Sequence, residues 1–184
     1  LTLENNSFCH ATSPTYGSAS VLEYAAGNYN TGLEWIAGSS VGAGVPNSVI
    51  INMDAATDRL TIDGSSAERT VPTDLTITSG GISLANNNNL IVGNAITNNG
   101  TLDIENGSSL VQTSSGDNNS GTTGTYNVTR EKTFEDLRRF VYVSSPVPSE
   151  SLGNVFPNSN ITDFYSYDPS TQAFVSHGAS TDMA

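Results

Sequence analysis

The chain has 184 residues, enough for one long domain or two small ones, and 18 acidic against 6 basic residues give it a net charge of −12. This charge argues against nucleic acid as a partner, because phosphate recognition needs a basic surface. A single cysteine, Cys9, excludes an internal disulfide, and no apolar run approaches the roughly 18 residues of a transmembrane segment.

The N-terminal segment 1–50 contains three short stretches with the alternating pattern of a β-strand, in which every second side chain points inward. The stretches LTLE and VLEY begin at Leu1 and Val21, and the third is centred on Val49. The step from Leu1 to Val21 has the length of one solenoid coil, whereas the step from Val21 to Val49 is clearly longer. The longer interval contains residues 28–44 with Trp35, and it predicts a longer loop or an extra strand there.

Strand-like segments then recur at a regular period between Leu60 and Gln112. They begin at Leu60, Leu75, Ile82, Leu90, Ile96, Leu102 and Leu110. Every third segment returns after nearly the same interval, which joins Leu60 to Ile82, Leu75 to Ile96, Ile82 to Leu102 and Leu90 to Leu110. A solenoid with three faces per coil produces this recurrence. The period predicts a parallel β-helix over residues 1–112, with coils of about 20–22 residues.

The pattern also predicts which side chains enter the solenoid. Leu102 and its equivalents should stack inside, while Asp103 should point outward. The asparagine runs at residues 86–89 and 98–100 fall between strands, where tight corners favour residues that tolerate a left-handed backbone.

The pattern changes after residue 112. Residues 113–124 (TSSGDNNSGTTG) contain no large apolar side chain and are predicted to be a linker between two domains. Aromatic-rich segments follow, namely TYNVTREK, RRFVYVSSPV, ITDFYSY and QAFVSHG, with a predicted turn at Asp168–Thr171. Because these strands are expected to pair locally, residues 125–184 are predicted to begin an antiparallel β-sandwich that is incomplete within the chain.

Several segments resemble a known group of proteins. They are GLEWIAGSSVGAGVPNSVIIN, RTVPTDLTITSGGISLANNNNLIVG, ITNNGTLDIENGSSLVQ and FVYVSSPVPSESLGNVFPNSNITDFYSYDPSTQAFVSHG, of which NNGTLDIENGSSLVQ and SSPV…ITDFYSYD are the most specific. These segments are similar to the repeat and post-repeat regions of large Bacteroidetes cell-surface proteins that the type IX secretion system exports. The sorting domain of such proteins is not recognisable in this sequence.

The resemblance implies a secreted repeat protein at the surface of a Gram-negative bacterium. It further implies a noncatalytic role as an adhesin, in gliding motility or in surface decoration, with any catalysis on other domains. The implied partners are the outer-membrane translocon and its associated proteins during export, together with surface glycans or other surface proteins.

Three aromatic residues are the candidates for ligand stacking: Trp35, Tyr24 and Tyr29. A flat aromatic face could stack on a sugar ring. More often such residues cap a solenoid or attach a long loop to it, and we favour this structural role.

Parallel β-helices include polysaccharide lyases and hydrolases, so a carbohydrate-binding or polysaccharide-degrading protein is the alternative function. The carboxylates of Asp54, Asp58 and Asp63 could lie along one corner or outer face. The repeat region, however, contains only Arg59 and Arg69 as basic residues for such chemistry. We therefore predict no catalytic residues and no enzyme activity.

No metal or cofactor site is predicted. Cys9 and His10 are adjacent, but two isolated ligands do not make a tetrahedral zinc site. The calcium-binding repeat GGxGxD is absent, because Gly80-Gly81 continues as Ile82-Ser83. One calcium ion on surface carboxylates is the remaining alternative.

Overall fold

The computed structural model describes residues 1–4, 7–64, 68–114, 119–120, 123–131, 151–157 and 164–182. The chain divides into two compact units, Leu1–Lys132 and Thr133–Ala184.

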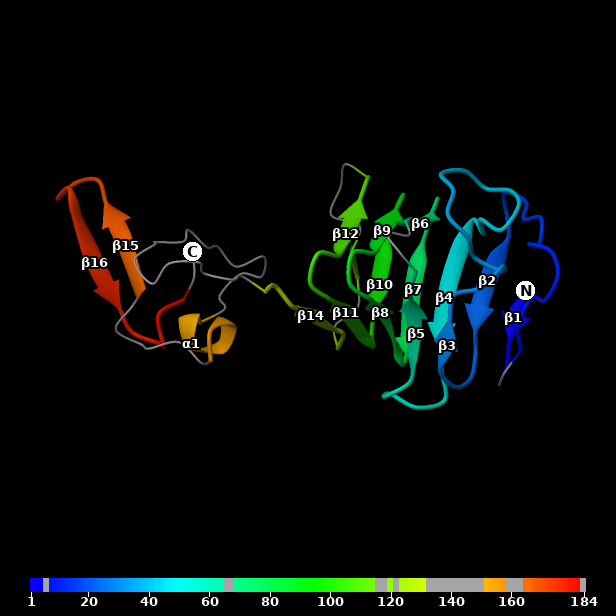
Figure 1. Ribbon diagram of the computed structural model, residues 1–184, viewed down its shortest axis with the longest axis horizontal. Coiled ribbons are helices and arrows are strands. Elements are labelled where there is room, and N and C mark those ends of the chain that lie inside the picture. The colour runs from blue at the N-terminus through cyan, green and yellow to red at the C-terminus, as the bar shows by residue number, and fades with distance from the viewer. Residues whose placement is uncertain are drawn as a thin grey trace. The chain divides into compact units, whose positions relative to one another are not determined.

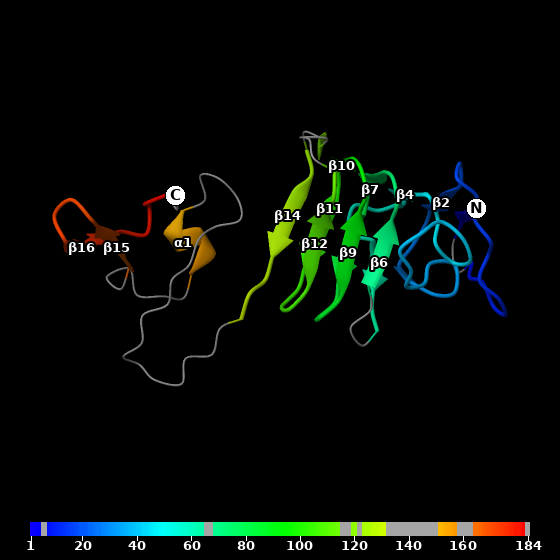
Figure 2. The ribbon, with the colours of Figure 1, turned by 90° about the horizontal axis from the view of Figure 1, so that it is seen from above.

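The first unit is a parallel β-solenoid built from three sheets (Figures 1 and 2). The first sheet has the order β1 (Thr2–Leu3), β2 (Val21–Tyr24), β4 (Ser48–Asn52), β7 (Leu75–Ser79), β10 (Ile96–Asn98) and β13 (Asn119–Ser120). The second has the order β3 (Tyr29–Asn30), β5 (Arg59–Ile62), β8 (Gly81–Leu84), β11 (Thr101–Ile104) and β14 (Thr125–Val128). The third contains β6 (Glu68–Val71), β9 (Asn89–Val92) and β12 (Ser109–Gln112). From β4 to β12, successive coils contribute one strand to each sheet, which confirms the predicted three-faced parallel β-helix.

The register confirms the predicted period. The four predicted correspondences are Cα partners: Leu60 with Ile82, Leu75 with Ile96, Ile82 with Leu102 and Leu90 with Leu110. The N-terminal correspondences were wrong by one residue, because Leu22, and not Val21, pairs with Val49. Burial gives the reason: Leu22 is 0% exposed and points inward, whereas Val21 is 39% exposed.

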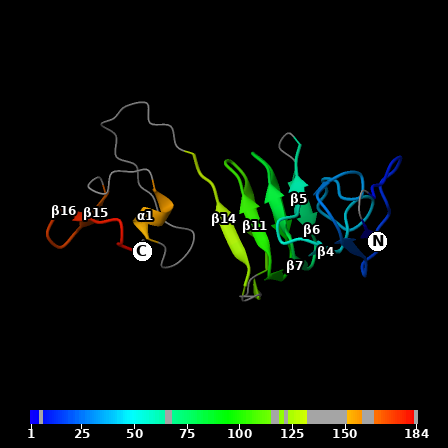
Figure 3. The ribbon, with the colours of Figure 1, turned by 90° about the horizontal axis from the view of Figure 1, so that it is seen from below.

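The predicted linker and domain boundary were wrong. Strand β13 pairs with β10 inside the interval assigned to the linker, and β14 pairs with β11 along its whole length (Figure 3). The register places Tyr126 beside Leu102 and Val128 beside Ile104, so β14 continues two inward columns of the solenoid. A polar segment without large apolar residues can be an excursion from one coil as well as a tether between domains. The solenoid unit therefore extends to Lys132.

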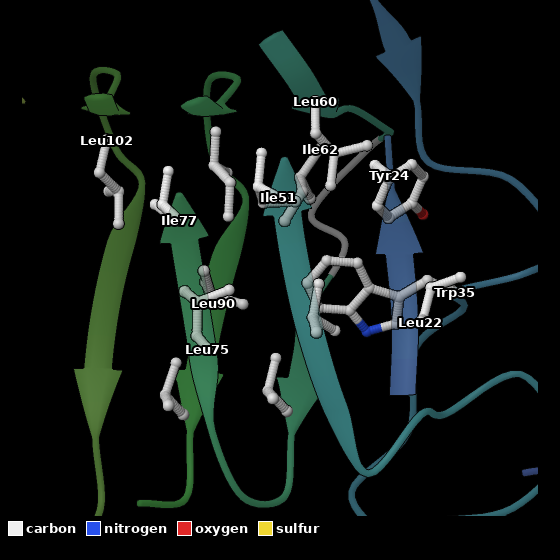
Figure 4. Packing of buried hydrophobic residues seen from close by; sticks show 14 of the residues in the cluster. Leu22, Tyr24, Trp35, Ile51, Leu60, Ile62, Leu75, Ile77, Leu90 and Leu102 are labelled. Atoms are coloured by element: carbon white, nitrogen blue, oxygen red, sulfur yellow. The ribbon is translucent and has the colours of Figure 1, made fainter. Parts of the chain in front are cut away.

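The solenoid interior is a continuous apolar core (Figure 4). The largest fully buried side chains are Trp35, Tyr24, Leu22, Ile51, Leu60, Ile62, Leu75, Ile77, Ile82, Leu84, Leu90 and Leu102. Each buried aliphatic side chain stabilises the fold by roughly 1.5–3 kcal/mol relative to an exposed one. Because each coil covers the next, this stack accounts for a stable unit without a disulfide.

Two stacked corners join the second sheet to the third. Asn87 and Gly107 lie at equivalent positions, with φ of 64° and 76°, which confirms the predicted need for a left-handed backbone in the first asparagine run. The Ser108 hydroxyl donates to the Ala85 carbonyl at 2.6 Å and accepts from the Asn88 amide at 3.1 Å. These bonds connect one corner to the next.

The second asparagine run contributes differently. Asn98 is the last residue of β10 and is only 2% exposed, in the column that Ile77 occupies one coil earlier. Its amide nitrogen donates to the Thr125 carbonyl at 3.2 Å, and its oxygen accepts from the Gly100 amide at 3.1 Å. The buried amide is therefore hydrogen-bonded to the backbone of its own corner and of the next coil.

Arg130 binds the last of these corners. Its guanidinium donates to the carbonyls of Glu105 at 3.1 Å, Thr129 at 2.8 Å and Ser108 at 2.9 Å. The neighbouring Glu131 amide donates to the Asn106 side chain at 3.0 Å. The guanidinium thus donates hydrogen bonds to two backbone carbonyls, of Glu105 and Ser108, in the corner after β11.

We expect Gly107→Ala to lower the free energy of unfolding by about 1–2 kcal/mol, because a Cβ there meets the Asn87 side chain and the backbone φ is positive. The control is Gly17→Ala, where a Cβ has no neighbour within 4 Å. Urea denaturation of both variants measures the difference. Equal stability of the two variants would contradict the corner geometry.

The second unit contains α1 (Leu152–Val155) and an antiparallel hairpin of β15 (Phe164–Asp168) and β16 (Ala173–His177). The pairing confirms the predicted antiparallel strands in ITDFYSY and QAFVSHG. No second sheet is present among the described residues of this unit, so its observed sheet is smaller than a sandwich. The predicted strand RRFVYVSSPV lies outside the described residues.

The predicted turn after β15 is confirmed. The Asp168 carboxylate accepts from the Ser170 amide at 2.9 Å, the Ser170 hydroxyl at 2.7 Å and the Thr171 hydroxyl at 2.9 Å. The hydrogen bonds from Ser170, and then the one from Thr171, hold the pKa of Asp168 below its usual value. This bonding explains why an aspartate begins the turn.

Candidate functional site

The most elaborate local structure is the segment 31–47, here called the strap. It follows β3 and precedes β4, the stretch of the coil in which later coils form a strand of the third sheet. The predicted longer loop is thus present, and it is not a strand of any sheet. Trp35 is its anchor, with 0% exposure and an indole nitrogen that donates to the Thr70 carbonyl at 3.1 Å.

Beside Trp35 the strap buries a carboxylate. Glu34 is 2% exposed, and its carboxylate accepts from the Tyr24 hydroxyl at 2.9 Å and the Gly32 amide at 2.7 Å. The Glu34 carbonyl accepts from the Tyr16 hydroxyl at 2.8 Å. Within the described residues, no cation lies within 4 Å of this carboxylate. Burying a carboxyl group is costly unless its oxygens are hydrogen-bonded, and here the bonds come from a tyrosine hydroxyl and a backbone amide.

Arg69 of β6 is the nearest buried base. It is 8% exposed and occupies the inward column of Leu90, where its terminal nitrogen donates to the Thr31 hydroxyl at 3.4 Å. Among the described residues, its Nε atom and the hydroxyl of Thr70 have no hydrogen-bond partner. Burial lowers the pKa of Arg69, although a guanidinium stays protonated at neutral pH. The space under the strap therefore holds polar groups that are incompletely satisfied.

The structure gives Trp35, Tyr24 and Tyr29 no open ring face for the ligand stacking considered for them. Trp35 and Tyr24 are 0% exposed and Tyr29 is 9% exposed, so none of them presents an open ring face. Tyr24 and Tyr29 contact each other edge to face, with ring centroids 5.4 Å apart. Figure 4 shows Tyr24 and Trp35 among the buried side chains of the core. The structural alternative fits: the rings attach the strap and fill the first coil.

The buried tyrosines make stability depend on pH in the alkaline range. Burial, followed by the Glu34 charge and the hydrogen bond to it, raises the pKa of Tyr24 well above its usual value. Because the unfolded chain loses this proton first, near pH 10, the contribution of Tyr24 to the free energy of unfolding should be constant below about pH 10 and fall above it. Tyr24→Phe should reduce the slope of the unfolding free energy against pH in this range by the equivalent of about one proton. Urea denaturation at a series of pH values measures this slope. An unchanged slope would contradict this assignment.

The carboxylates considered for catalysis do not converge. Asp58 accepts from the Asn28 side chain at 3.3 Å and the Ala55 amide at 3.2 Å, which is corner bonding. Asp54 is exposed and Asp63 is partly buried one strand further on. Asp103 points outward as predicted and pairs with Arg59 at 2.9 Å. Their hydrogen bonds are those of structural corner and strand residues.

Potential metal ligands are likewise dispersed. Across residues 1–4, 7–64, 68–114, 123–131, 151–157 and 164–182, no three His, Cys, Asp or Glu side chains are grouped to hold a metal ion. Cys9 is partly buried, and burial raises the pKa of its thiol. His10 contacts the ring of Phe8, with centroids 6.0 Å apart. In the described part of the chain, no helix has the length and apolarity needed to cross a membrane.

Three exposed aromatic residues lie on the hairpin of the second unit. Tyr165, Tyr167 and Phe174 are 52%, 54% and 59% exposed. Alternation puts both tyrosines on one face of β15, and the register pairs Tyr167 with Phe174 on that same face. The rings of this pair contact edge to face, with centroids 5.6 Å apart. This aromatic face was not predicted, although the spacing Y-S-Y in a strand was a signal for it.

Comparison with known proteins identifies one family, described as "Domain of unknown function (DUF8693)", which matches residues 25–184. The chain belongs to this family. It matches none of the curated proteins and none of the solved structures with which it was compared.

The DUF8693 match includes the strap, Arg69 and the aromatic face of the hairpin, and it covers residues of both units. The matched region also includes a polar contact between the two strands of the hairpin, where the Ser166 hydroxyl and Nε2 of His177 are 2.7 Å apart. A serine beside a histidine is one element of nucleophilic catalysis, which further needs a group that orients the imidazole and donors for an oxyanion. The pair joins the two antiparallel strands β15 and β16 as a cross-strand hydrogen bond.

Proposed function

We propose that this chain is a noncatalytic structural and adhesion module of a secreted bacterial cell-surface protein, exported by the type IX secretion system. The observation that carries the proposal is the solenoid itself, a regular stack of coils whose ionisable side chains form corner and cross-strand bonds. Stacked coils offer extended surfaces suited to display and contact. The resemblance of NNGTLDIENGSSLVQ and the SSPV…ITDFYSYD segment to exported surface proteins supports the export route.

Under this proposal, the outer-membrane translocon and its associated proteins are partners during export. Surface glycans or other surface proteins are partners afterwards. The net charge of −12 is consistent with partners of both kinds, because it keeps the protein soluble and disfavours binding to nucleic acid.

Location and catalysis can be tested separately. Protease treatment of intact producing cells should remove the protein, while a periplasmic marker stays intact. The purified chain should release no reducing ends or unsaturated products from a panel of polysaccharides. Persistence of the protein on treated cells would refute the surface location. Turnover that is lost in Asp54→Asn, Asp58→Asn or Asp63→Asn would refute the noncatalytic role.

Carbohydrate binding is the second candidate function, favoured by the exposed aromatic face of the hairpin. Tyr165 and Tyr167 are two residues apart on one strand, a separation of about 6.6 Å. Exposed rings in such a row can stack against sugar rings.

A glycan array tests this second function. Tyr167→Ala should weaken binding of any retained glycan about fivefold or more, since stacked aromatic rings contribute on the order of 1 kcal/mol or more. The matched control is Val175→Ala, which removes an exposed side chain from the opposite face of the hairpin. Equal binding by the two variants would reject the aromatic face as the sugar site.

A further inference from the structure

The strap covers one edge of the third sheet, at strand β6. Strand β6 is the first strand of the third sheet, so one of its edges has no strand neighbour. The Trp35 indole donates to the Thr70 carbonyl of that strand. Unpaired edges invite pairing with other chains, and covering them with a loop is one way in which proteins prevent it.

The backbone of the strap is bonded to the solenoid coils at its ends. The Thr31 amide donates to the Thr61 carbonyl at 3.0 Å, and the Asn47 carbonyl accepts from the Thr73 amide at 3.0 Å. The backbone bonds between these ends are local or reach only residues 14–16. They include Ile36 to Gly44 at 2.8 Å, Gly44 to Pro14 at 2.7 Å and Tyr16 to Gly42 at 2.9 Å. The strap thus lacks the ladder that connects each coil to the next.

Side chains make the remaining attachments, and their surroundings are polar and incompletely bonded. Trp35 is the apolar anchor, and Glu34 accepts from Tyr24. Three buried groups oppose these attachments. Within the described residues, the Glu34 carboxylate has no cation within 4 Å, and Nε of Arg69 and the hydroxyl of Thr70 have no hydrogen-bond partner. Opening the strap would return these groups to water, which offsets part of the cost of exposing the indole.

We propose that the strap is a guard for the β6 edge that opens as one unit while the solenoid coils remain folded. The fold provides a cooperative segment, held by a few side-chain contacts, beside coils held by continuous ladders. The open state exposes the β6 edge to an added strand. This device is independent of the export and adhesion proposed above.

The chain carries its own reporter, because Trp35 is the only tryptophan and lies in the strap. Selective tryptophan fluorescence of the full chain should therefore respond to strap opening, and far-UV circular dichroism to loss of the coils. On addition of urea, the red shift of Trp35 should precede the loss of the β signal. Without denaturant, the amides of Ile36 and Gly44 should exchange with deuterium at least about tenfold faster than those of β8 and β11. Coincident transitions together with equal exchange would overturn the proposal.

A matched pair of variants distinguishes opening of the strap from unfolding of the coils. Tyr24→Phe removes one donor to the Glu34 carboxylate and should favour strap opening on the order of 10- to 100-fold, so the fluorescence transition moves to lower urea while the β transition stays. Ile82→Val, in the middle of the stack, should move the β transition and leave the fluorescence transition in place. If Tyr24→Phe moves both transitions equally, strap and coils are one cooperative unit and the guard does not open independently.

Discussion

Leu102→Asp is expected to destabilise the protein by several kcal/mol, enough to unfold much of the solenoid at room temperature. Leu102 is 0% exposed and lies between Ile82 and Tyr126 in an inward column. A carboxylate there has no cation or donor to replace water, and burying it unpaired is among the most costly single changes. Thermal and urea melts of the purified variant measure the loss.

The matched change is at the next position along the same strand. Asp103 points outward, pairs with Arg59 at 2.9 Å and accepts from the Asn127 side chain at 2.6 Å. Asp103→Ala should therefore cost about 0.5–1 kcal/mol, a little more than an unpaired surface residue. If it proved more damaging than Leu102→Asp, the inward and outward faces of β11 would have to be exchanged.

Trp35→Ala is expected to cost about 3–5 kcal/mol, because it removes the largest fully buried side chain and leaves a cavity under the strap. It also leaves the Thr70 carbonyl without its indole donor. The loss should appear in urea denaturation, whereas Phe8→Ala, at a ring that is 70% exposed, should change little. Loss of ligand binding at full stability in Trp35→Ala would instead return Trp35 to the role of a binding residue.

The period of the sequence was sufficient to predict the solenoid and the pairing of its central coils. This worked because inward Leu, Ile and Val residues repeat once per coil wherever coils have similar corners. It failed where other residue types take inward positions. Strand β6 carries Arg69 and Thr70, so it lacks the aliphatic pattern and was not predicted. The N-terminal register was wrong because Val21 fits a strand as well as Leu22 does, and only packing distinguishes them.

The candidate site was less predictable than the fold. Trp35 and Tyr24 were identified as important, but a sequence does not say whether a ring faces a ligand or a core. Glu34 was missed, because its burial depends on Tyr24 in an earlier strand and on the strap closing over it. The polar segment 113–124 was misread as a linker, since an excursion within a coil and a tether between domains have the same composition.

The corner bonds and the constant register of the central coils make the solenoid modular in length. Ile82 and Leu102 are partners in adjacent coils, and the corners at Asn87 and Gly107 repeat at the same interval. A duplicated coil between them would meet the same columns above and below, and would add about 4.8 Å to the stack. The strap beside β6, and Arg130 at the corner after β11, would remain unchanged. Evolution can thus adjust the reach of such a stack in whole coils, without redesigning either end.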